Sequence, residues 1–319
     1  MSDQAKYIWF NGNTVPWENA KIHVMSHILH YGSGVFEGIK CYSTNEGPAI
    51  FRLNDHIERL FLSAEKYGIT IPYSKETIST ACIETVHLNG FTDCYIRPIA
   101  YYGYDTLGVH PKDCPVEVAV ASFYWGAYLG EEGLTSGVDI TISPWKKFSL
   151  EAFPPSAKAS GQYMNSMLAV QDARKRGFDE ALLLNQHGNI AEGSGQNIFI
   201  VKNNIIYTND VNASILMGIT RESIIHICKS LGYTIEIVDL TTKMLLTADE
   251  AFFTGSATEI TPIATVDRAP IGDGKPGKIT LELKDLYMNI IQGKESKYHH
   301  WLTFINTNKN ISKTVLENH

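Results

Sequence analysis

The chain has 319 residues, of which 44% are hydrophobic and 19% charged, and its formal net charge is −7. This length allows two domains with real cores, and an acidic balance without a basic stripe argues against nucleic acid as a partner. Five scattered cysteines, none in a C-x-x-C pair, favour reduced thiols over disulfides or zinc. The N-terminus lacks the apolar core of a signal peptide, and no apolar run is long enough to span a membrane. We therefore expect a cytoplasmic protein.

The first 124 residues predict a small N-terminal domain of mixed strands and helices. A strand at 7–10 is followed by Asn11-Gly12, a dipeptide typical of hairpin turns. Apolar residues at helical spacing predict a helix from its cap at Asn54 or Asp55 to about Tyr67. We also expect strands at 49–52, 94–102 and 116–124, and a helix at 75–88.

Glycines at 126, 130 and 133 predict an interdomain linker over residues 125–136. Residues 137–319 predict a larger C-terminal domain, so the fold class is α/β with mixed α+β character. The elements expected in it are strands at 138–142, 181–184, 197–201, 205–208, 234–238 and 250–253, with helices at 162–176, 220–231 and 241–247. The polar tail after about Asn306 is expected to fray.

Lys158 and Glu192 carry the main chemical signal. Lys158 stands among small residues just before a predicted helix, where a lysine can form an imine with an aldehyde cofactor. Glu192 precedes Gly-Ser-Gly and a strand, a place where a fixed carboxylate can keep a pyridine nitrogen protonated. Taken singly, a lysine is more often a solvated surface charge, and such a glutamate an ordinary turn residue before glycines of positive φ. Together they suggest pyridoxal phosphate chemistry.

A phosphorylated cofactor also needs backbone donors and a cation. Thr220 opens a predicted helix, and Ser256 lies in a glycine turn after a buried strand, so both turns are candidate anion sites. Arg59 is the candidate cation, and Tyr95 and Arg97 share one side of a strand, which suggests a wall that binds a carboxylate. Each feature also has a purely structural alternative. Thr220 could be a helix cap and Ser256 part of a strand-to-loop turn. Arg59 could form a surface ion pair, and Tyr95 and Arg97 could be a pair at a sheet edge.

Two further patterns do not support a site. His23, His27 and His30 repeat at helical spacing, but no Glu follows His23 to complete H-E-x-x-H, so we predict no metal site. The glycines of 32–38 resemble a dinucleotide loop, but the third glycine comes one residue late and no clear βαβ unit surrounds it. A nicotinamide cofactor is therefore not expected.

Eight segments, in order and over about residues 7–302, closely resemble the branched-chain amino acid aminotransferases of the fold-type-IV pyridoxal phosphate class. These segments are His30–Gly38, Arg52–Leu60, Tyr95–Pro98, Trp125–Gly130, Lys158–Tyr163, Glu192–Asn197, Gly218–Arg221 and Gly255–Pro262.

The resemblance implies a role for each matching position. Lys158 would form the Schiff base with pyridoxal 5′-phosphate and move the substrate proton, and Glu192 would hold the ring nitrogen protonated. Because a base must be neutral to take a proton, we predict a depressed pKa for Lys158. The other cofactor-binding positions implied are Arg59, Tyr163, Ile219, Thr220 and Ser256. The substrate-binding positions implied are Phe36, Tyr95, Arg97, Trp125, Tyr163, Ser256 and Ala257, with Tyr31 and Val109 reaching in from a second subunit.

The implied reaction is transamination between L-leucine, L-isoleucine or L-valine and 2-oxoglutarate, giving the 2-oxo acids and L-glutamate, in a homodimer or a hexamer. Tyr95 with the backbone of Ser256 and Ala257 would receive the α-carboxylate, and Arg97 the γ-carboxylate of glutamate. Ser256 stands where threonine is expected, and Thr258 where a small alanine is expected, which leaves the substrate ranking open. The alternatives are a D-amino acid transaminase, an aminodeoxychorismate lyase, or a non-catalytic small-ligand binding protein.

Overall fold

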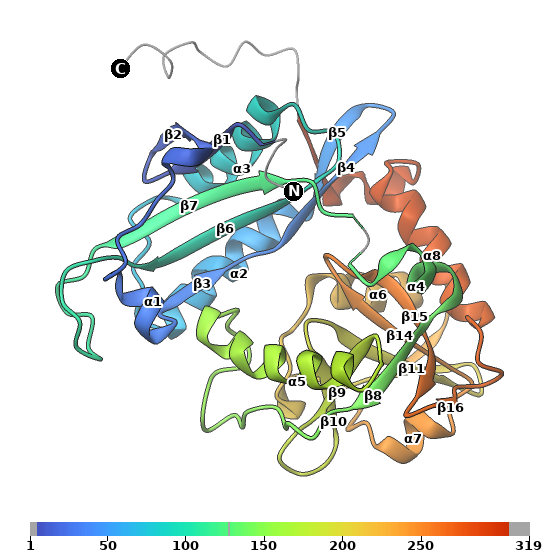
Figure 1. The fold of residues 1–319 in the computed structure, drawn as a ribbon. Helices are drawn as coiled ribbons and strands as arrows, with labels where there is room; N and C mark the ends of the chain where they lie inside the picture. The colour runs from blue at the N-terminus through green and yellow to red at the C-terminus, as the bar shows by residue number, and fades with distance from the viewer. Residues whose placement is uncertain (1–4, 127, 306–319) are drawn as a thin grey trace. The chain divides into compact units, whose positions relative to one another are not determined.

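The structure is a computed structural model that describes residues 5–126 and 128–305 (Figure 1). The tail predicted to fray after Asn306 lies outside these residues. The chain forms two compact units. Of the described residues, the first contains 5–125, 157–161 and 289–305, and the second contains 126, 128–156 and 162–288. No helix in the described ranges is long and apolar enough to cross a membrane.

The first unit is built on an antiparallel sheet that has eight strands within the described residues, in the order β17-β5-β4-β6-β7-β1-β2, with β3 paired to β6. Its strands are β1 (Tyr7–Phe10), β2 (Asn13–Pro16), β3 (Gly34–Phe36), β4 (Ile39–Thr44), β5 (Gly47–Phe51), β6 (Cys94–Tyr102), β7 (Val116–Phe123) and β17 (Leu302–Phe304). Its helices are α1 (His27–Tyr31), α2 (Leu53–Lys66) and α3 (Lys75–Asn89), with 3-10 turns η2 (Trp17–Asn19) and η5 (Ser296–Trp301).

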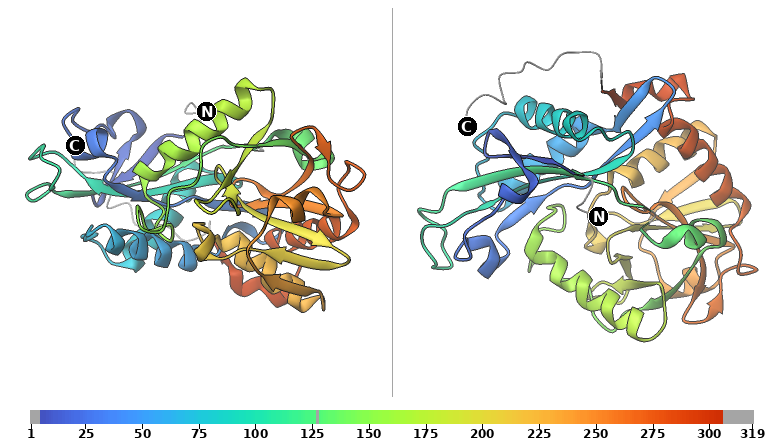
Figure 2. Two further views of the ribbon diagram at one scale, coloured as in Figure 1. Left: turned by 90° about the horizontal axis from the view of Figure 1, so that it is seen from below. Right: turned by 45° about the horizontal axis from the view of Figure 1, so that its top comes forward.

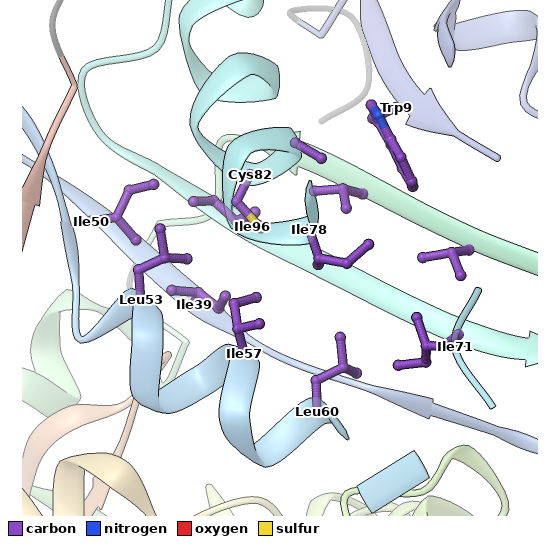
Figure 3. Close-up of a cluster of buried hydrophobic side chains, with 14 of the residues drawn as sticks. Trp9, Ile39, Ile50, Leu53, Ile57, Leu60, Ile71, Ile78, Cys82 and Ile96 are labelled. Carbon is purple, nitrogen blue, oxygen red and sulfur yellow. The ribbon is translucent and has the colours of Figure 1, made fainter. Parts of the chain in front are cut away.

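Helices α2 and α3 pack on each other and on this sheet (Figure 2). The apolar face predicted for α2 is confirmed, because Leu53, Ile57 and Leu60 are fully buried. Figure 3 shows these side chains meeting those of α3 and the sheet in one cluster. Burying aliphatic side chains from both layers, at about 1.5–3 kcal/mol each, supplies the main stabilisation of this unit.

The second unit is built on a mixed sheet that has nine strands within the described residues, in the order β10-β9-β8-β15-β14-β11-β12-β13, with β16 on β15. Its strands are β8 (Val138–Ile142), β9 (Glu180–Leu184), β10 (Ile190–Gly193), β11 (Asn197–Lys202), β12 (Ile205–Thr208), β13 (Thr234–Ile237), β14 (Glu250–Gly255), β15 (Glu259–Val266) and β16 (Ala269–Pro270). Its helices are α4 (Gly130–Ser136), α5 (Tyr163–Lys175), α6 (Ile219–Ser230), α7 (Thr242–Leu246) and most of α8 (Lys278–Ile291), with 3-10 turns η3 (Ser160–Gln162), which begins in the first unit, and η4 (Val211–Ala213).

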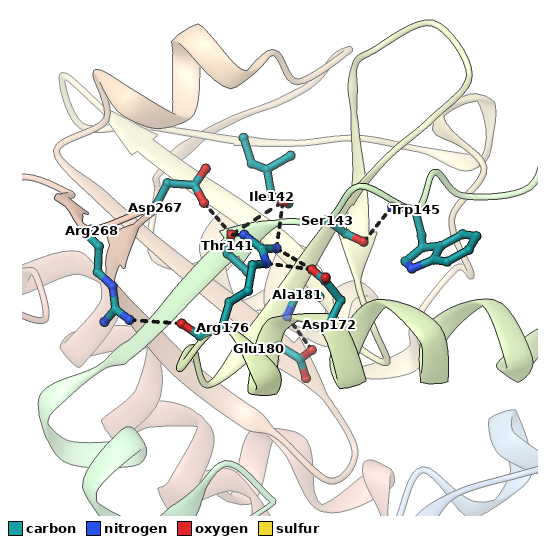
Figure 4. Close-up of polar contacts among 10 residues, drawn as sticks. All are labelled: Thr141, Ile142, Ser143, Trp145, Asp172, Arg176, Glu180, Ala181, Asp267 and Arg268. Atoms are coloured by element: carbon teal, nitrogen blue, oxygen red, sulfur yellow. Dashed lines mark hydrogen bonds and ion pairs between the residues drawn. The ribbon is translucent and has the colours of Figure 1, made fainter.

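A polar clamp fixes the C-terminal end of α5 to this sheet (Figure 4). Arg176 donates from Nε to Asp172 over 2.7 Å and from Nη1 to Thr141 Oγ1 over 2.8 Å. Thr141 in turn donates to Asp267 at the end of β15. Because Arg176 follows directly on α5 and Thr141 lies in β8, the clamp sets where the helix ends on the sheet.

Local sequence signals predicted most elements correctly. The Asn11-Gly12 hairpin is confirmed, with Phe10 paired to Asn13 and both turn residues at positive φ. Two helix starts differ: the cap of α2 is Arg52 at φ 51°, whose Nε donates to Asp55, and the cap of α6 is Gly218. Within the predicted linker, the residues of α4 are helical instead of irregular.

The assignment of segments to units also departs from the predicted domain boundaries. Residues 157–161 and 289–305 belong to the first unit, although they follow the predicted linker in the sequence. The reason is long-range pairing, because β17 pairs with β5 and Ala159 bridges Val35. Domain boundaries predicted from the composition of consecutive residues cannot take such pairings between distant segments into account.

Asn89, at the end of α3, joins three elements of the first unit, and its loss should destabilise the fold. Its Oδ1 accepts from the backbone N–H groups of Lys6 and Tyr7, and its Nδ2 donates to Tyr7 O, Thr85 O and Ser122 Oγ. We expect Asn89→Ala to lower the free energy of unfolding by about 2–3 kcal/mol, because several backbone partners lose their bonds together.

Urea denaturation measures this loss, with Asn54→Ala on the exposed side of α2 as the matched control. The control should change the free energy of unfolding by less than about 0.5 kcal/mol. Equal, small effects of the two substitutions would show that the Asn89 network does not stabilise the fold.

Candidate active site

Four backbone contacts hold the segment that carries Lys158 in the first unit. The N–H of Lys158 donates to Ser63 Oγ over 3.0 Å, and its carbonyl accepts from the N–H of Phe36 over 3.0 Å. Gly161 N–H donates to Gly32 O, and Ala159 bridges Val35. A Cβ on Gly32 would lie 2.7 Å from the Cα of Gly161, so glycine is required for this approach. The lysine is therefore fixed by its backbone beside β3.

The amine of Lys158 lies among charged and aromatic groups of the same unit. Its Nζ is 5.0 Å from the centroid of the Phe36 ring. Burial is the main cause that lowers the pKa of Lys158 to about 8, and the Arg59 and Arg97 cations lower it further. The Glu37 carboxylate and Tyr95 act in the opposite direction. The predicted depression of this pKa is confirmed, and it gives an amine with a substantial neutral fraction near neutral pH.

Glu37, which was not among the predicted site residues, organises the charges around this lysine. It is fully buried, and it accepts from Arg59 Nε over 2.6 Å and Nη2 over 2.9 Å, and from His56 Nδ1 over 2.7 Å. Burial raises the pKa of Glu37, but Arg59 and His56 outweigh burial and hold the carboxyl ionised. Burial lowers the pKa of His56 despite this neighbour, so a neutral imidazole donates the bond. The predicted phosphate cation, Arg59, is thus oriented by a buried carboxylate.

Tyr95 and Arg97 form a wall beside Phe36, as the strand period predicted. The guanidinium carbon of Arg97 lies 4.8 Å from the Phe36 ring centroid and 5.3 Å from that of Tyr95. Trp125 packs edge-on against Tyr95 at 4.7 Å between ring centroids. No hydrogen-bond partner among the described residues faces the buried Nε of Arg97. A Cβ on Gly38 would lie 1.8 Å from the Tyr95 hydroxyl, so this glycine makes room for the wall.

Tyr31 and Val109, the residues expected to serve a second subunit, lie on two connected segments. Tyr31 donates from its hydroxyl to Leu107 O over 2.8 Å, and His27 Nε2 lies 2.9 Å from Gly108 O. Both predicted side chains are exposed, Tyr31 by 44% and Val109 by 81%. The first unit therefore exposes both side chains on two segments that hydrogen bonds hold together.

In the second unit, Glu192 lies in β10 and is buried. Its Oε1 lies 2.6 Å from Lys147 Nζ, and its Oε2 accepts from Leu216 N–H over 3.1 Å and from Asn197 Nδ2 over 3.3 Å. The alternative of an ordinary turn whose glycines have positive φ does not describe this segment, because neither Gly193 nor Gly195 adopts positive φ. Space explains Gly193 instead, since a Cβ there would lie 2.3 Å from Gln196 Oε1.

The remaining predicted residues of the second unit lie at the starts of two helices and in one turn. Ile219 and Thr220 form the first turn of α6, where Gly218 provides no side-chain cap for the backbone donors. Ser256 and Ala257 lie between β14 and β15, near Glu192, because β14 pairs Thr254 with Asn197. Tyr163 is the half-buried first residue of α5. The backbone N–H groups at the start of α6 suit the binding of an anion at a helix N-terminus.

Within the described ranges, no group of three or more His, Cys, Asp or Glu is placed to hold a metal ion. His27 of the histidine pattern is buried, and its Nδ1 lies 2.7 Å from Ser33 Oγ. Its ring supports the Tyr31 surface, which accounts for one histidine of the pattern without a metal.

The amine of Lys158 should titrate with a pKa of about 8 in cofactor-free protein, instead of its ordinary 10.5. Because the folded pKa is the lower one, the unfolded chain binds this proton more tightly between these two pH values. The contribution of Lys158 to the free energy of unfolding therefore increases with pH over that window. Glu37→Gln should move the midpoint lower, because it removes a negative charge that raises the pKa.

Amine labelling against pH, followed by peptide mass analysis of Lys158, measures the midpoint, and exposed Lys146 serves as the reference lysine. A midpoint for Lys158 equal to that of Lys146 would contradict the proposed environment.

Comparison with known proteins identifies the family. Residues 34–266 match the family model described as "Amino-transferase class IV". The chain is 42% identical over 305 residues to the branched-chain-amino-acid aminotransferase of Pseudomonas aeruginosa, covering 96% of this chain and 99% of that protein. It is 40% identical over 304 residues to the enzyme of that name from Escherichia coli K12, covering 95% and 98%.

Solved structures agree with this result. That of the T.th. branched-chain amino acid aminotransferase with pyridoxamine 5′-phosphate has a TM-score of 0.92 and 46% identity, covering 95% of this chain and 99% of that one. That of the Escherichia coli enzyme has a TM-score of 0.93 and 40% identity, covering 95% and 100%. The predicted fold class is thereby confirmed. The chain belongs to the class IV aminotransferases, and within them to the branched-chain amino acid aminotransferase family.

Proposed function

We propose that this protein transfers the amino group of L-leucine, L-isoleucine or L-valine to 2-oxoglutarate, using pyridoxal 5′-phosphate. The observation that carries the proposal is Lys158, whose segment is held by four backbone contacts and whose amine has a pKa of about 8. The family supports the same reaction, since related structures bear a pyridoxamine phosphate or a phosphopyridoxyl-glutamate adduct.

The residues of the chain suit this cofactor. When bound, pyridoxal 5′-phosphate supplies an aldehyde for an amine and a ring that accepts electrons from the substrate carbon. Lys158 would hold the cofactor and then carry the proton, a role for which a depressed pKa suits it. Glu192 is a buried carboxylate that would accept the ring N–H. The uncapped turn at Ile219 and Thr220, with Ser256 and Arg59, would bind the phosphate, and Tyr163 would lie beside the phenolic oxygen.

The wall of Phe36, Tyr95 and Arg97 would let one site accept both an apolar and an acidic substrate. Tyr95 with the backbone of Ser256 and Ala257 would receive the α-carboxylate. Arg97 would bind the γ-carboxylate of glutamate, and its buried Nε, which lacks a partner among the described residues, supports that role. Phe36, Trp125 and Tyr163 would contact the aliphatic side chain of leucine.

A second copy of the chain and a cytoplasmic location complete the proposal. Tyr31 and Val109 are exposed apolar side chains held on one surface, which suits their use as the pocket wall of a partner subunit in a homodimer. All five cysteines are buried and free, which suits a reducing compartment. Hexamer formation would be an assembly of such dimers.

Lys158→Ala should abolish turnover of L-leucine with 2-oxoglutarate and remove the visible absorption of the protein-bound cofactor, because no amine remains to bind the aldehyde. Normal turnover by Lys158→Ala would refute the assignment.

Spectral titration of wild-type protein with L-leucine, D-alanine and aminodeoxychorismate tests the reaction itself. A response to L-leucine alone is expected. Colourless wild-type protein that takes up no pyridoxal 5′-phosphate would instead indicate a binding protein.

Arg97→Met should separate the two half-reactions. We expect kcat/KM for L-glutamate to fall by about 100-fold or more, the cost of losing a charge-assisted bidentate contact, while that for L-leucine changes by less than about 5-fold. Single-turnover spectra with each amino acid measure both values. Arg174→Met, at an exposed arginine of the second unit, is the matched control. Equal losses for glutamate and leucine would contradict a specific role for Arg97.

A further inference from the structure

Lys147, which no sequence pattern singled out, makes a buried ion pair with Glu192. Its Nζ lies 2.6 Å from Glu192 Oε1, and the two side chains are only 8% and 7% exposed. Lys147 is itself fixed, because its backbone N–H donates to Leu184 O over 2.8 Å and its Nζ lies 4.6 Å from the centroid of the Phe148 ring. Lys147 is therefore a fixed part of the second unit, whereas the side chain of a surface lysine is mobile.

The contacts of Glu192 leave few acceptor directions open. An ionised carboxylate offers about four lone-pair sites. Lys147 takes one on Oε1, and Leu216 N–H and Asn197 Nδ2 take two on Oε2. Together these donors fix the rotation of the carboxylate and leave it able to accept one further hydrogen bond.

Lys147 also supplies the positive charge that compensates the buried carboxylate of Glu192. A buried charge is costly unless it is paired with an opposite charge and hydrogen-bonded. Leu216 N–H and the Asn197 amide are neutral, and Lys147 makes the only ion pair to Glu192 among the described residues. Without Lys147, this buried carboxylate would have neutral donors alone.

We propose that Lys147 is a positioning residue that acts through Glu192, pairing with this carboxylate and holding it oriented toward the ring nitrogen of the cofactor. The inference rests on the proposed function. It predicts that loss of Lys147 weakens the binding of a cofactor only when that cofactor has a ring nitrogen for Glu192 to bind.

The test compares pyridoxal 5′-phosphate with its 1-deaza analogue, in which a C–H replaces the ring nitrogen. We expect Lys147→Met to raise the dissociation constant of pyridoxal 5′-phosphate by about 10-fold or more, as supporting residues around a ligated group commonly do. The dissociation constant of the deaza analogue should change by less than about 2-fold. Lys147→Arg should restore binding to within about 3-fold of wild type, since it restores the cation.

Two further variants complete the experiment. In a Glu192→Gln background, Lys147→Met should add less than about 2-fold to the dissociation constant, because the carboxylate through which it acts is gone. Lys146→Met, at the exposed neighbouring lysine, is the matched control and should leave both dissociation constants unchanged. If Lys147→Met does not fold, Lys147→Gln, which removes the charge and keeps a donor, takes its place.

The outcomes separate this inference from the proposed function. Equal weakening of both ligands by Lys147→Met would show a merely structural lysine, and no weakening of either would show an irrelevant one; both overturn the inference alone. A wild-type protein that binds neither ligand would overturn the proposed function and this inference with it.

Discussion

The hydrogen bonds that anchor residue 158 against β3 are the constraint on which the chemistry of the first unit depends. They bring a lysine from the middle of the sequence beside residues that precede it by some hundred positions, including Phe36 and Ser63. In solvent, the same amine would keep a pKa near 10.5 and would be protonated at neutral pH. The anchoring places it where burial removes water and neighbouring cations oppose its charge.

Burial is the main cause that lowers the pKa of Lys158, and the neighbouring charges then act in opposite directions, with Glu37 opposing the arginines. Arg59 and Arg97 both disfavour the ammonium form, and Glu37 favours it. Because Glu37 is bound to Arg59 through two hydrogen bonds, the carboxylate moderates the effect of that arginine and also fixes its direction. An arginine left alone beside the lysine would depress its pKa further and would be free to choose its own rotamer.

Local signals predicted the elements of this fold well, and long-range pairing accounts for what was missed. Asn11-Gly12 and the cap of α3 at Ser74 act within a few residues, so the sequence displays them directly. The pairing of β17 with β5 joins residues more than two hundred positions apart and leaves no local trace. The cap of α2 is Arg52 in a left-handed conformation, and not Asn54 or Asp55, because the backbone N–H of Arg52 donates to Trp301 O.

The site residues divide in the same way. Lys158 and Glu192 could be found in the sequence because their neighbouring residues are unusual. No spacing rule pairs Glu37, just after a strand, with His56 on a helix.

Each compact unit therefore contains a buried carboxylate whose charge is balanced within that unit. Glu37 accepts four hydrogen bonds, two from Arg59, one from a neutral histidine and one from the Gly38 N–H. Glu192 has three donors, which are one lysine and two neutral amide groups. Because a carboxylate offers about four lone-pair sites, Glu37 has none left, whereas Glu192 keeps one acceptor direction for a further partner. The difference in donors thus matches a difference in role, because Glu37 is a fixed charge beside the lysine and Glu192 remains able to bind.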